Sequence, residues 1–322
     1  MNFKTIDPEQ STLKEVHRLL LGGVAPRPIA LVSTISADGI NNLAPYSFFN
    51  AFGANPPYVA FSPAFSGRDG SAKDTYNNLK EVPECVVQVV TYNMIEQVNL
   101  SSTSYAPEVD EFVKSGFTAI DSDLIKPKRV MESPFHMECR VEQIIPLGGS
   151  NGSGNLVLCR VVKIHVRDDI FENNQINPDL IDLVGRNSGN YYTRARGDAI
   201  FELKRPPEIG IGIDQLPPHI KESVILSAND LARLGSSPSL KEKKELIAFL
   251  ESCKKNKISA DNKSAIKEHD DYKNIYNEGY ALWQNDQIKA KELIETAAKK
   301  ALAMHDIDFA LLALQSIEIL TE

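Results

Sequence analysis

A lysine, an aspartate and a threonine stand side by side in the segment SAKDTYNNL, where together they could bind an anion. Asp74 and Thr75 are residue types that favour the start of a helix, and apolar side chains follow at helical spacing over residues 76–82. Lys73 adds a mobile cation next to this helix start. Because the first N–H groups of a helix have no partner within the helix, an anion binds well there. The sequence therefore predicts an anion-binding site at Lys73.

A second polar segment, PYSFFNAFG at residues 45–53, does not alternate as a strand on a hydrophobic core would. Ser47 and Asn50 place a hydroxyl and an amide beside the aromatic rings of Phe48 and Phe49. This combination suits a planar polar heterocycle, with hydrogen bonds at its edge and rings against its face. A turn at the end of a sheet with two buried phenylalanines explains the pattern equally well. Both interpretations stay open at the level of the residues.

The other residues with chemical potential favour structural roles. The glycine-rich segment GGSNGSGN (148–155) connects two strand-like segments, which favours a hairpin loop over a phosphate-binding loop that leads into a helix. His136 and His165 alternate with apolar neighbours and are expected on sheet faces with ordinary hydrogen bonds. No Ser-His-Asp or Cys-His arrangement can be defended from the spacing, so no catalytic residue is assigned.

The cysteines are scattered along the chain and contain no CxxC motif: Cys85, Cys139, Cys159 and Cys253. Three of them lie in apolar, strand-like segments, so we expect buried, reduced thiols. The histidines are equally dispersed, which argues against a zinc or other metal site.

The composition of the 322 residues excludes some classes of partner. A net charge of −8 and an isoelectric point near 5.4 argue against nucleic acid, which normally requires a basic stripe. The first residues contain no apolar signal core, and no window approaches the roughly 18 consecutive apolar residues of a membrane-spanning helix. We therefore expect a cytoplasmic protein without a membrane partner.

Composition also divides the chain near residue 210, because 15 of the 18 glycines and 15 of the 18 prolines lie at or before it. Helices in this first part are expected near 8–21, at 74–82 and within 93–116. Strands are expected at six segments: 28–36, 40–48, 57–63, 84–92, 136–147 and 155–166. Because regular helices do not separate these strands, we expect an α+β fold built on a largely antiparallel barrel.

The sequence pattern of the second part predicts helices. Its aromatic residues recur at helical spacing and form a stripe typical of a hydrophobic core. The stripe comprises Tyr272, Tyr276, Tyr280 and Trp283. The expected helices are 227–235, 239–255, 271–284, 288–304 and 307–320, with Ser227 as a cap and Gly235 as a stop. We expect a barrel domain over 1–205, a linker or lid over 206–235, and a helical extension over 236–322.

Several ordered motifs of the first part resemble a known family. They are RPIALVSTIS, NLAPYSFFNAFGANPPYVAFSP, KDTYNNL, EQVNLSS and ESPFHMECRVEQIIPLG. Together they resemble the flavin reductase-like proteins with an FMN-binding split barrel, in particular the flavoprotein oxygenase-like branch. The resemblance extends over about residues 20 to 200. It implies a split β-barrel of about six mainly antiparallel strands with peripheral helices, to which the second part adds an all-α C-terminal extension.

The resemblance also implies which residues bind FMN. Lys73, Asp74 and Thr75 match the segment that holds the FMN phosphate, in agreement with the anion site predicted above. Ser47, Phe48, Phe49 and Asn50 match the segment that lines the flavin ring and its ribityl chain. Four further positions match residues close to the cofactor: Arg27, Ser62, Asn99 and Ser101. The family usually forms a homodimer with the flavin near the subunit interface, so we expect a homodimer.

Two functions follow from this resemblance. The first is an FMN-dependent oxidoreductase, in which NADH, NADPH or another donor reduces the flavin and a second acceptor receives the electrons. Arg27 could then stabilise negative charge on the reduced flavin. The second is a non-catalytic flavin-binding module whose C-terminal helices bind a protein partner. These helices could also simply cover a face of the barrel and widen the dimer contact.

Overall fold

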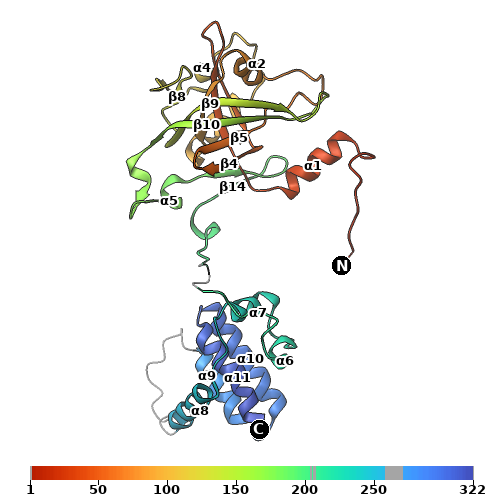
Figure 1. The fold of residues 1–322 in the computed structure, drawn as a ribbon, viewed down its shortest axis with the longest axis vertical. Coiled ribbons are helices and arrows are strands. Elements are labelled where there is room, and N and C mark those ends of the chain that lie inside the picture. Colours follow the sequence, from red (N-terminus) through yellow and green to blue (C-terminus); the bar gives the residue numbers. More distant parts are fainter. Residues whose placement is uncertain (1, 204, 206–207, 258–270, 322) are drawn as a thin grey trace. The chain divides into compact units, whose positions relative to one another are not determined.

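The computed structural model describes residues 2–203, 205, 208–257 and 271–321. It divides into two compact units, Met1–Glu202 and Leu203–Glu322 (Figure 1), and buried hydrophobic residues cluster within each of them. None of the described helices combines the length and the apolar character that crossing a membrane requires.

The first unit is built on one seven-stranded sheet in which every neighbouring pair of strands is antiparallel. Across the sheet the order is β3-β2-β6-β9-β10-β5-β4. The strands are β2 (Ala30–Ile35), β3 (Asn41–Tyr46), β4 (Phe49–Ala54), β5 (Pro57–Phe61), β6 (Glu84–Val89), β9 (Phe135–Pro146) and β10 (Asn155–Val166). Strands β9 and β10 form the long hairpin predicted around the glycine-rich loop, in which Gly152 adopts a φ of +79°.

The connection between β3 and β4 shows that this sheet curls into a barrel. These strands form opposite edges of the sheet, yet only Ser47 and Phe48 link them. Two linking residues span about 11 Å at most, whereas the edges of a flat seven-stranded sheet lie about 29 Å apart. The two ends therefore meet, and the Tyr46 and Phe61 rings lie 5.4 Å apart across the junction. The predicted α+β split barrel is confirmed, with its split at Ser47.

The inside of the barrel is filled by alternating strand residues such as Val32, Phe61 and Val87. Three cysteines, Cys85, Cys139 and Cys159, are part of this core. They are free and buried, as is Cys253 in the second unit, which confirms the prediction of buried, unpaired thiols.

Strand β4 was missing from the strands expected from the sequence. It forms an edge of the sheet, and its residues beyond Phe49 are exposed, including Phe52 at 66%. An edge strand with no buried face has no alternating pattern, so its sequence did not indicate a strand.

The helices of the first unit are α1 (Leu13–Gly23), α2 (Asp74–Glu81), α3 (Ile95–Ser101), α4 (Glu111–Ser115) and α5 (Pro178–Ile181). Helix α1 begins later than the expected residue 8, because the Thr12 side chain caps it by accepting the Glu15 N–H. Single-turn 3-10 helices occur at Tyr92–Met94, Asp168–Ile170 and Gly197–Ala199.

Small sheets complete the unit. A three-stranded sheet has the order β1-β13-β14, with β1 at Arg27–Pro28, β13 at Val184–Arg186 and β14 at Tyr192–Arg194. The pairs β7 (Ala119–Ile120) with β8 (Arg129–Val130) and β11 (Phe171–Glu172) with β12 (Gln175–Ile176) are two-stranded.

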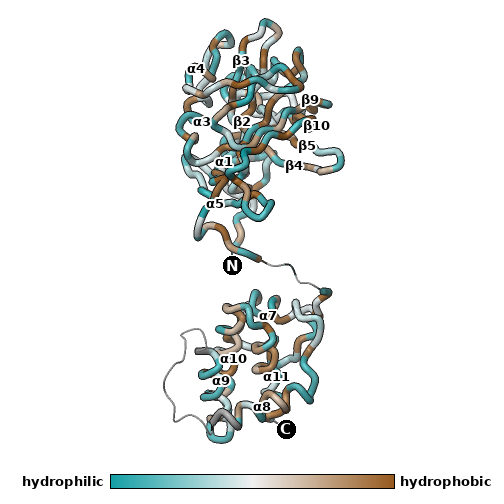
Figure 2. Tube along the Cα trace, turned by 90° about the vertical axis from the view of Figure 1, so that its left-hand side faces the viewer, coloured by the Kyte–Doolittle hydropathy of each residue, from teal (hydrophilic) through white to brown (hydrophobic). Residues whose placement is uncertain are grey.

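The described part of the second unit is helical: α6 (Pro218–Lys221), α7 (Ala228–Gly235), α8 (Lys243–Lys257), α9 (Asp271–Leu282), α10 (Gln287–Ala303) and α11 (Ile307–Thr321). Figure 2 shows hydrophobic stretches along α10 and α11, which supply much of the core. Tyr272, Tyr276 and Trp283 are buried in it, as expected for a core stripe. Helix α7 starts at Ser227 with a full capping box and ends at Gly235.

The segment 206–235, expected to be a linker or a lid, contributes to this helical core. Leu216, Ile220, Leu226 and Leu234 are buried in the same cluster as the residues of α9 to α11. These side chains therefore place the described part of the segment in the second unit.

Candidate functional site

Two adjoining pockets lie at the split of the barrel, and they share Pro45, Tyr46 and Ser102 in their walls. We call the first the α2 pocket, because the start of helix α2 borders it; its volume is about 250 Å³. We call the second the hairpin pocket, because Arg186 and Tyr192 of the β13–β14 hairpin border it; its volume is about 200 Å³. The two pockets are therefore neighbours, and we refer to them together as the groove.

The α2 pocket contains Lys73, the cation of the anion-binding site predicted from the sequence. Lys73 is the N-cap residue of α2 and is exposed. The N-cap side chain accepts no hydrogen bond from the first N–H groups of this helix, so the start of α2 keeps donors and the positive end of its dipole. Residues with hydroxyl groups also line this pocket, at Ser101, Ser102, Thr103 and Ser104. A cation, helix N–H groups and hydroxyls together form a donor set suited to a phosphate.

A buried hydrogen-bond network holds the start of α2 against the barrel. Asn42 on β3 donates from its amide to the hydroxyls of Thr34 and Thr75, at 2.9 Å each. Asn78, one turn further along α2, donates to the same Thr34 hydroxyl at 3.1 Å. Thr75 is therefore a positioning residue with a satisfied hydroxyl, and the network fixes where α2 begins relative to β2 and β3.

Two carboxyl groups also border the α2 pocket. Glu111, at the start of α4, is buried and accepts the Leu43 N–H at 3.1 Å, and burial raises the pKa of its carboxyl. Burial also raises the pKa of Asp74, while the nearby Lys73 opposes the shift. When ionised, either carboxyl repels a bound phosphate, so the lysine and the helix N–H groups must outweigh them.

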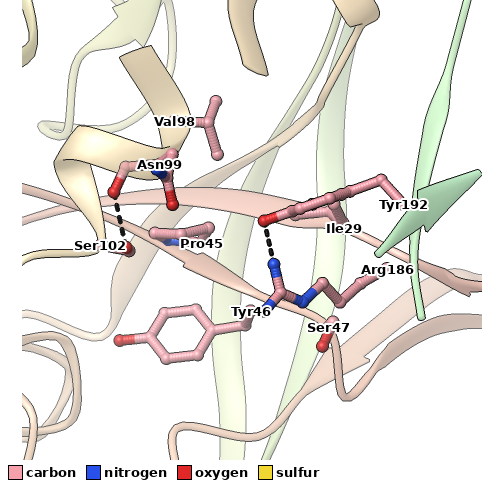
Figure 3. Close-up of a pocket in the computed structure, with 9 residues that line it drawn as sticks. All are labelled: Ile29, Pro45, Tyr46, Ser47, Val98, Asn99, Ser102, Arg186 and Tyr192. Carbon is pink, nitrogen blue, oxygen red and sulfur yellow. Dashed lines mark hydrogen bonds between the residues drawn. The ribbon is translucent and has the colours of Figure 1, made fainter. Parts of the chain in front are cut away.

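Arg186 provides the charge in the wall of the hairpin pocket. Its guanidinium donates to the Tyr192 hydroxyl and, at 2.6 Å, to the Gly189 carbonyl, and it lies 4.5 Å from the centre of the Tyr192 ring. Figure 3 shows the guanidinium between Ser47 and Tyr192. On the far wall the Asn99 carbonyl accepts the Ser102 hydroxyl at 2.6 Å.

The Tyr46 hydroxyl is an unsatisfied polar group at the boundary of the two pockets. It is buried and has no hydrogen bond of good geometry within the described residues; burial raises the pKa of this phenol, and the nearby Thr75 hydroxyl lowers it in part. Leaving such a group without a partner costs about 1–3 kcal/mol. A polar ligand in the groove would supply the missing partner.

Arg27 lies behind the hairpin pocket and does not line it. It is buried to 4% exposure, and its guanidinium donates to the carbonyls of Leu21 at 2.8 Å and Val24 at 2.5 Å. It also donates to the Asn187 carbonyl at 3.2 Å and to the Ser47 hydroxyl at 3.3 Å. The residue thus ties the end of α1 to the split of the barrel and orients Ser47.

The structure gathers six of the expected site residues in the groove: Ser47, Lys73, Asp74, Thr75, Asn99 and Ser101. The other expected residues lie outside its walls. Phe48 is 38% exposed and packs 6.0 Å from the Arg27 guanidinium, and Phe49 packs against the barrel core. Asn50 is exposed on β4 and its amide oxygen accepts the Ala51 N–H. Ser62 accepts the Asn155 N–H at 3.0 Å near the β9–β10 hairpin.

Sequence reasoning missed Arg186 and Tyr192 altogether. They lie about 140 residues beyond Ser47 in the segment GRNSGNYY, which contains no long strand pattern. Close packing brings them to the pocket, because Gly185 pairs with Pro28 and a β-carbon on it would lie 2.9 Å from Pro26. Tyr46 and Ser102 lie inside motifs quoted above, and only their side-chain roles went unnoticed.

One cluster of potential metal ligands occurs elsewhere among the described residues. Asp123, Glu138 and His165 bring ligand atoms within 4.8 Å of one another. The buried Glu138 accepts the N–H groups of Asp123 and Leu124, and His165 lies 2.7 Å from one of its oxygens. Because these partners already occupy the carboxylate, the cluster has the character of a structural network.

The seven-stranded split barrel, with a polar groove at its split, defines the class of this protein as a split-barrel protein. The chain belongs to the flavin reductase-like family, because the model of the flavin reductase like domain matches residues 22–192. An uncharacterized protein of Halalkalibacterium halodurans is 39% identical over 205 residues, which are 62% of this chain and 96% of that relative.

The chain is also similar to solved structures. Nitrilotriacetate monooxygenase component B from Bacillus cereus is 33% identical, with a TM-score of 0.59 over 63% of this chain and 100% of that one. The 2-nitrobenzoate 2-nitroreductase of Pseudomonas fluorescens is 27% identical, with a TM-score of 0.54 over 62% of this chain and 96% of that one. The family match ends at residue 192, so the helical unit lies outside it.

Proposed function

We propose that the protein is an FMN-dependent oxidoreductase that takes electrons from NADH, NADPH or another donor and passes them to a second acceptor. The observation that carries this proposal is that the two pockets adjoin, with three residues common to their walls. An uncapped helix start with a lysine lies at one end of the groove, and Ser47, Asn99 and Arg186 lie at the other. A phosphorylated ring compound requires both ends.

In this proposal the phosphate of FMN binds at Lys73 and the start of α2, with the hydroxyls of Thr103 and Ser104 as further donors. The single phosphate-sized donor set favours FMN over FAD. Tyr46 would gain a partner for its unsatisfied hydroxyl. When bound, FMN supplies the redox chemistry, so the residues of the chain need only bind, orient and shield it.

The relatives support an oxidoreductase. Two proteins with more than 25% identity are a monooxygenase component and a nitroreductase by name. No acid–base pair is required of the protein in hydride transfer to a flavin, which agrees with the lack of an assigned catalytic residue in the sequence.

The purified protein tests the cofactor directly. We expect a yellow solution whose absorbance is that of a flavin and which releases FMN on denaturation. Anaerobic titration with NADH and with NADPH should then bleach the absorbance with at least one of them. A protein that stays colourless after incubation with FMN would contradict the proposal.

We further propose a homodimer formed through the exposed β4 edge of the barrel. Phe48 and Phe52 are 38% and 66% exposed there, and an unpaired apolar edge strand normally pairs or is covered. Light scattering should give twice the monomer mass, and Phe52→Asp should lower it. The matched control Phe201→Asp changes a phenylalanine that is even more exposed, at 80%, and lies outside the sheet. The free thiols in turn support a reducing, cytoplasmic location.

The second function, a flavin-binding module that recruits a partner, rests on the helical unit. This unit has a core of its own and lies outside the family match. Tight FMN binding without reduction by either nicotinamide would favour the module, provided that a chain ending at Glu202 also loses a protein partner. Steady NADH or NADPH oxidation by the full chain would favour the enzyme.

A further inference from the structure

Arg186 is the charged residue in the wall of the hairpin pocket. Its hydrogen-bond partners, the Tyr192 hydroxyl and the Gly189 carbonyl, are neutral. Within the described residues, no carboxylate lies within ion-pair distance of it. Two of the five N–H groups of its guanidinium are occupied by these bonds, which leaves donors for a ligand.

A second arginine makes this arrangement electrostatically unusual. Strands β1 and β13 pair with Arg27 directly opposite Arg186, and like charges at directly opposite positions destabilise a sheet. Burial, and after it the charge of Arg186, lowers the pKa of Arg27. The partners of Arg27 are also neutral. Two guanidinium groups thus flank Ser47 without a carboxylate between them.

The two arginines differ in what they can reach. Arg27 is buried and its donors are used by three backbone carbonyls and by Ser47. Arg186 is half-buried and lines the pocket, with its position fixed by stacking on Tyr192. The role in stabilising charge that the sequence suggested for Arg27 therefore fits Arg186 better, and Arg27 reinforces it from behind.

We propose that Arg186 stabilises the negative charge that the flavin ring gains on reduction, so that the protein binds reduced FMN more tightly than oxidised FMN. This inference rests on the proposed function. Uptake of two electrons and one proton leaves the ring with one additional negative charge, for which the pocket offers the guanidinium of Arg186. Tyr192 is a positioning residue, because its hydroxyl and ring hold that guanidinium in place.

The experiment measures the dissociation constants of oxidised and reduced FMN for the full chain. Sodium dithionite, which is oxidised to sulfite, supplies the two electrons under anaerobic conditions, and the buffer supplies the proton. The variants are Arg186→Gln, which removes the charge, and Tyr192→Phe, which removes only the hydroxyl. Arg68→Gln is the matched control, because Arg68 is exposed and outside both pockets.

We expect Arg186→Gln to weaken the binding of reduced FMN at least tenfold more than that of oxidised FMN. Each tenfold difference lowers the two-electron potential of bound FMN by about 30 mV, which equilibration with a redox dye measures independently of turnover. Tyr192→Phe should produce a smaller loss in the same direction, and Arg68→Gln none. Tyr192→Phe keeps the test decisive even if the Arg186 variant does not fold.

Equal losses for oxidised and reduced FMN, or no loss for either, would overturn this inference while the proposed function stands. A wild-type protein that binds no FMN in either state would overturn the proposed function itself. The two failures are therefore distinguishable.

Discussion

The lysine at the start of α2 gives the sharpest prediction about the cofactor. Replacing Lys73 by alanine removes the cation of the α2 pocket without removing a helix cap, because the Lys73 side chain makes no capping hydrogen bond. The free energy of unfolding should therefore change by less than about 0.5 kcal/mol. The affinity for FMN should fall, while that for riboflavin, which has no phosphate, should not.

The magnitude follows from the exposure of the side chain. A hydrogen bond to a charged group contributes about 1.5–3 kcal/mol, and screening reduces this contribution because Lys73 is exposed. We expect a loss of about 1–2 kcal/mol, or about 5- to 30-fold in the dissociation constant of FMN. The loss should shrink as the salt concentration rises.

The assay is a fluorescence titration of each flavin with the wild-type protein and its variants. Lys80→Ala is the matched control, since Lys80 is exposed on the same helix but lies in its last turn, away from the pocket. It should leave both affinities unchanged. If Lys73→Ala weakened riboflavin as much as FMN, or weakened neither, the assignment of the phosphate to the start of α2 would be refuted.

Three further substitutions test the groove and its support. Tyr46→Phe removes a buried hydroxyl that has no hydrogen bond of good geometry, so urea unfolding should show a free protein at least as stable as the wild type, while FMN binds more weakly. Glu111→Gln removes a carboxyl whose pKa is raised by burial, so its ionised form destabilises the fold. The variant should therefore be more stable than the wild type at neutral pH. This gain should be absent well below pH 4.5 and should grow as the pH rises through the raised pKa. Asp182→Asn breaks the paired hydrogen bonds from Arg194, at 2.7 and 2.6 Å, that lower the pKa of Asp182. That pair stabilises the fold above the unfolded pKa of 3.8 and loses its effect as the pH falls through the lowered value. The variant should therefore lower the free energy of unfolding by about 1 kcal/mol at pH 7 and by progressively less below pH 3.8.

The parts of the fold that the sequence predicted are those with a buried face. Strand β10 alternates because one face packs into the barrel core, and periodicity detects that directly. Strand β2 is buried on both faces and appears in the sequence as a continuous apolar, β-branched segment. The start of α2 was also predicted, from the helix-capping residue types Asp74 and Thr75, although the N-cap residue is Lys73 and neither of the two caps the helix. Strand β4 went unnoticed because an exposed edge imposes no pattern on its residues.

The site itself could be predicted only in part. Lys73, Asp74 and Thr75 are neighbours in sequence, so their chemistry was visible before the fold was known. Arg186 reaches the hairpin pocket through the pairing of β13 with β1, a contact between segments about 160 residues apart. No local pattern encodes such a contact, and the same pairing explains why Arg27, which is prominent in the sequence, turns out to be enclosed by carbonyls.

A crystal structure of the protein grown with FMN tests the central claim most directly. We expect phosphate oxygens within about 2.7–3.2 Å of the first N–H groups of α2 and near the Lys73 ammonium, with the ring directed toward Ser47 and Arg186. A phosphate bound elsewhere on the barrel, or an α2 pocket filled by its own side chains in the presence of saturating FMN, would contradict the account.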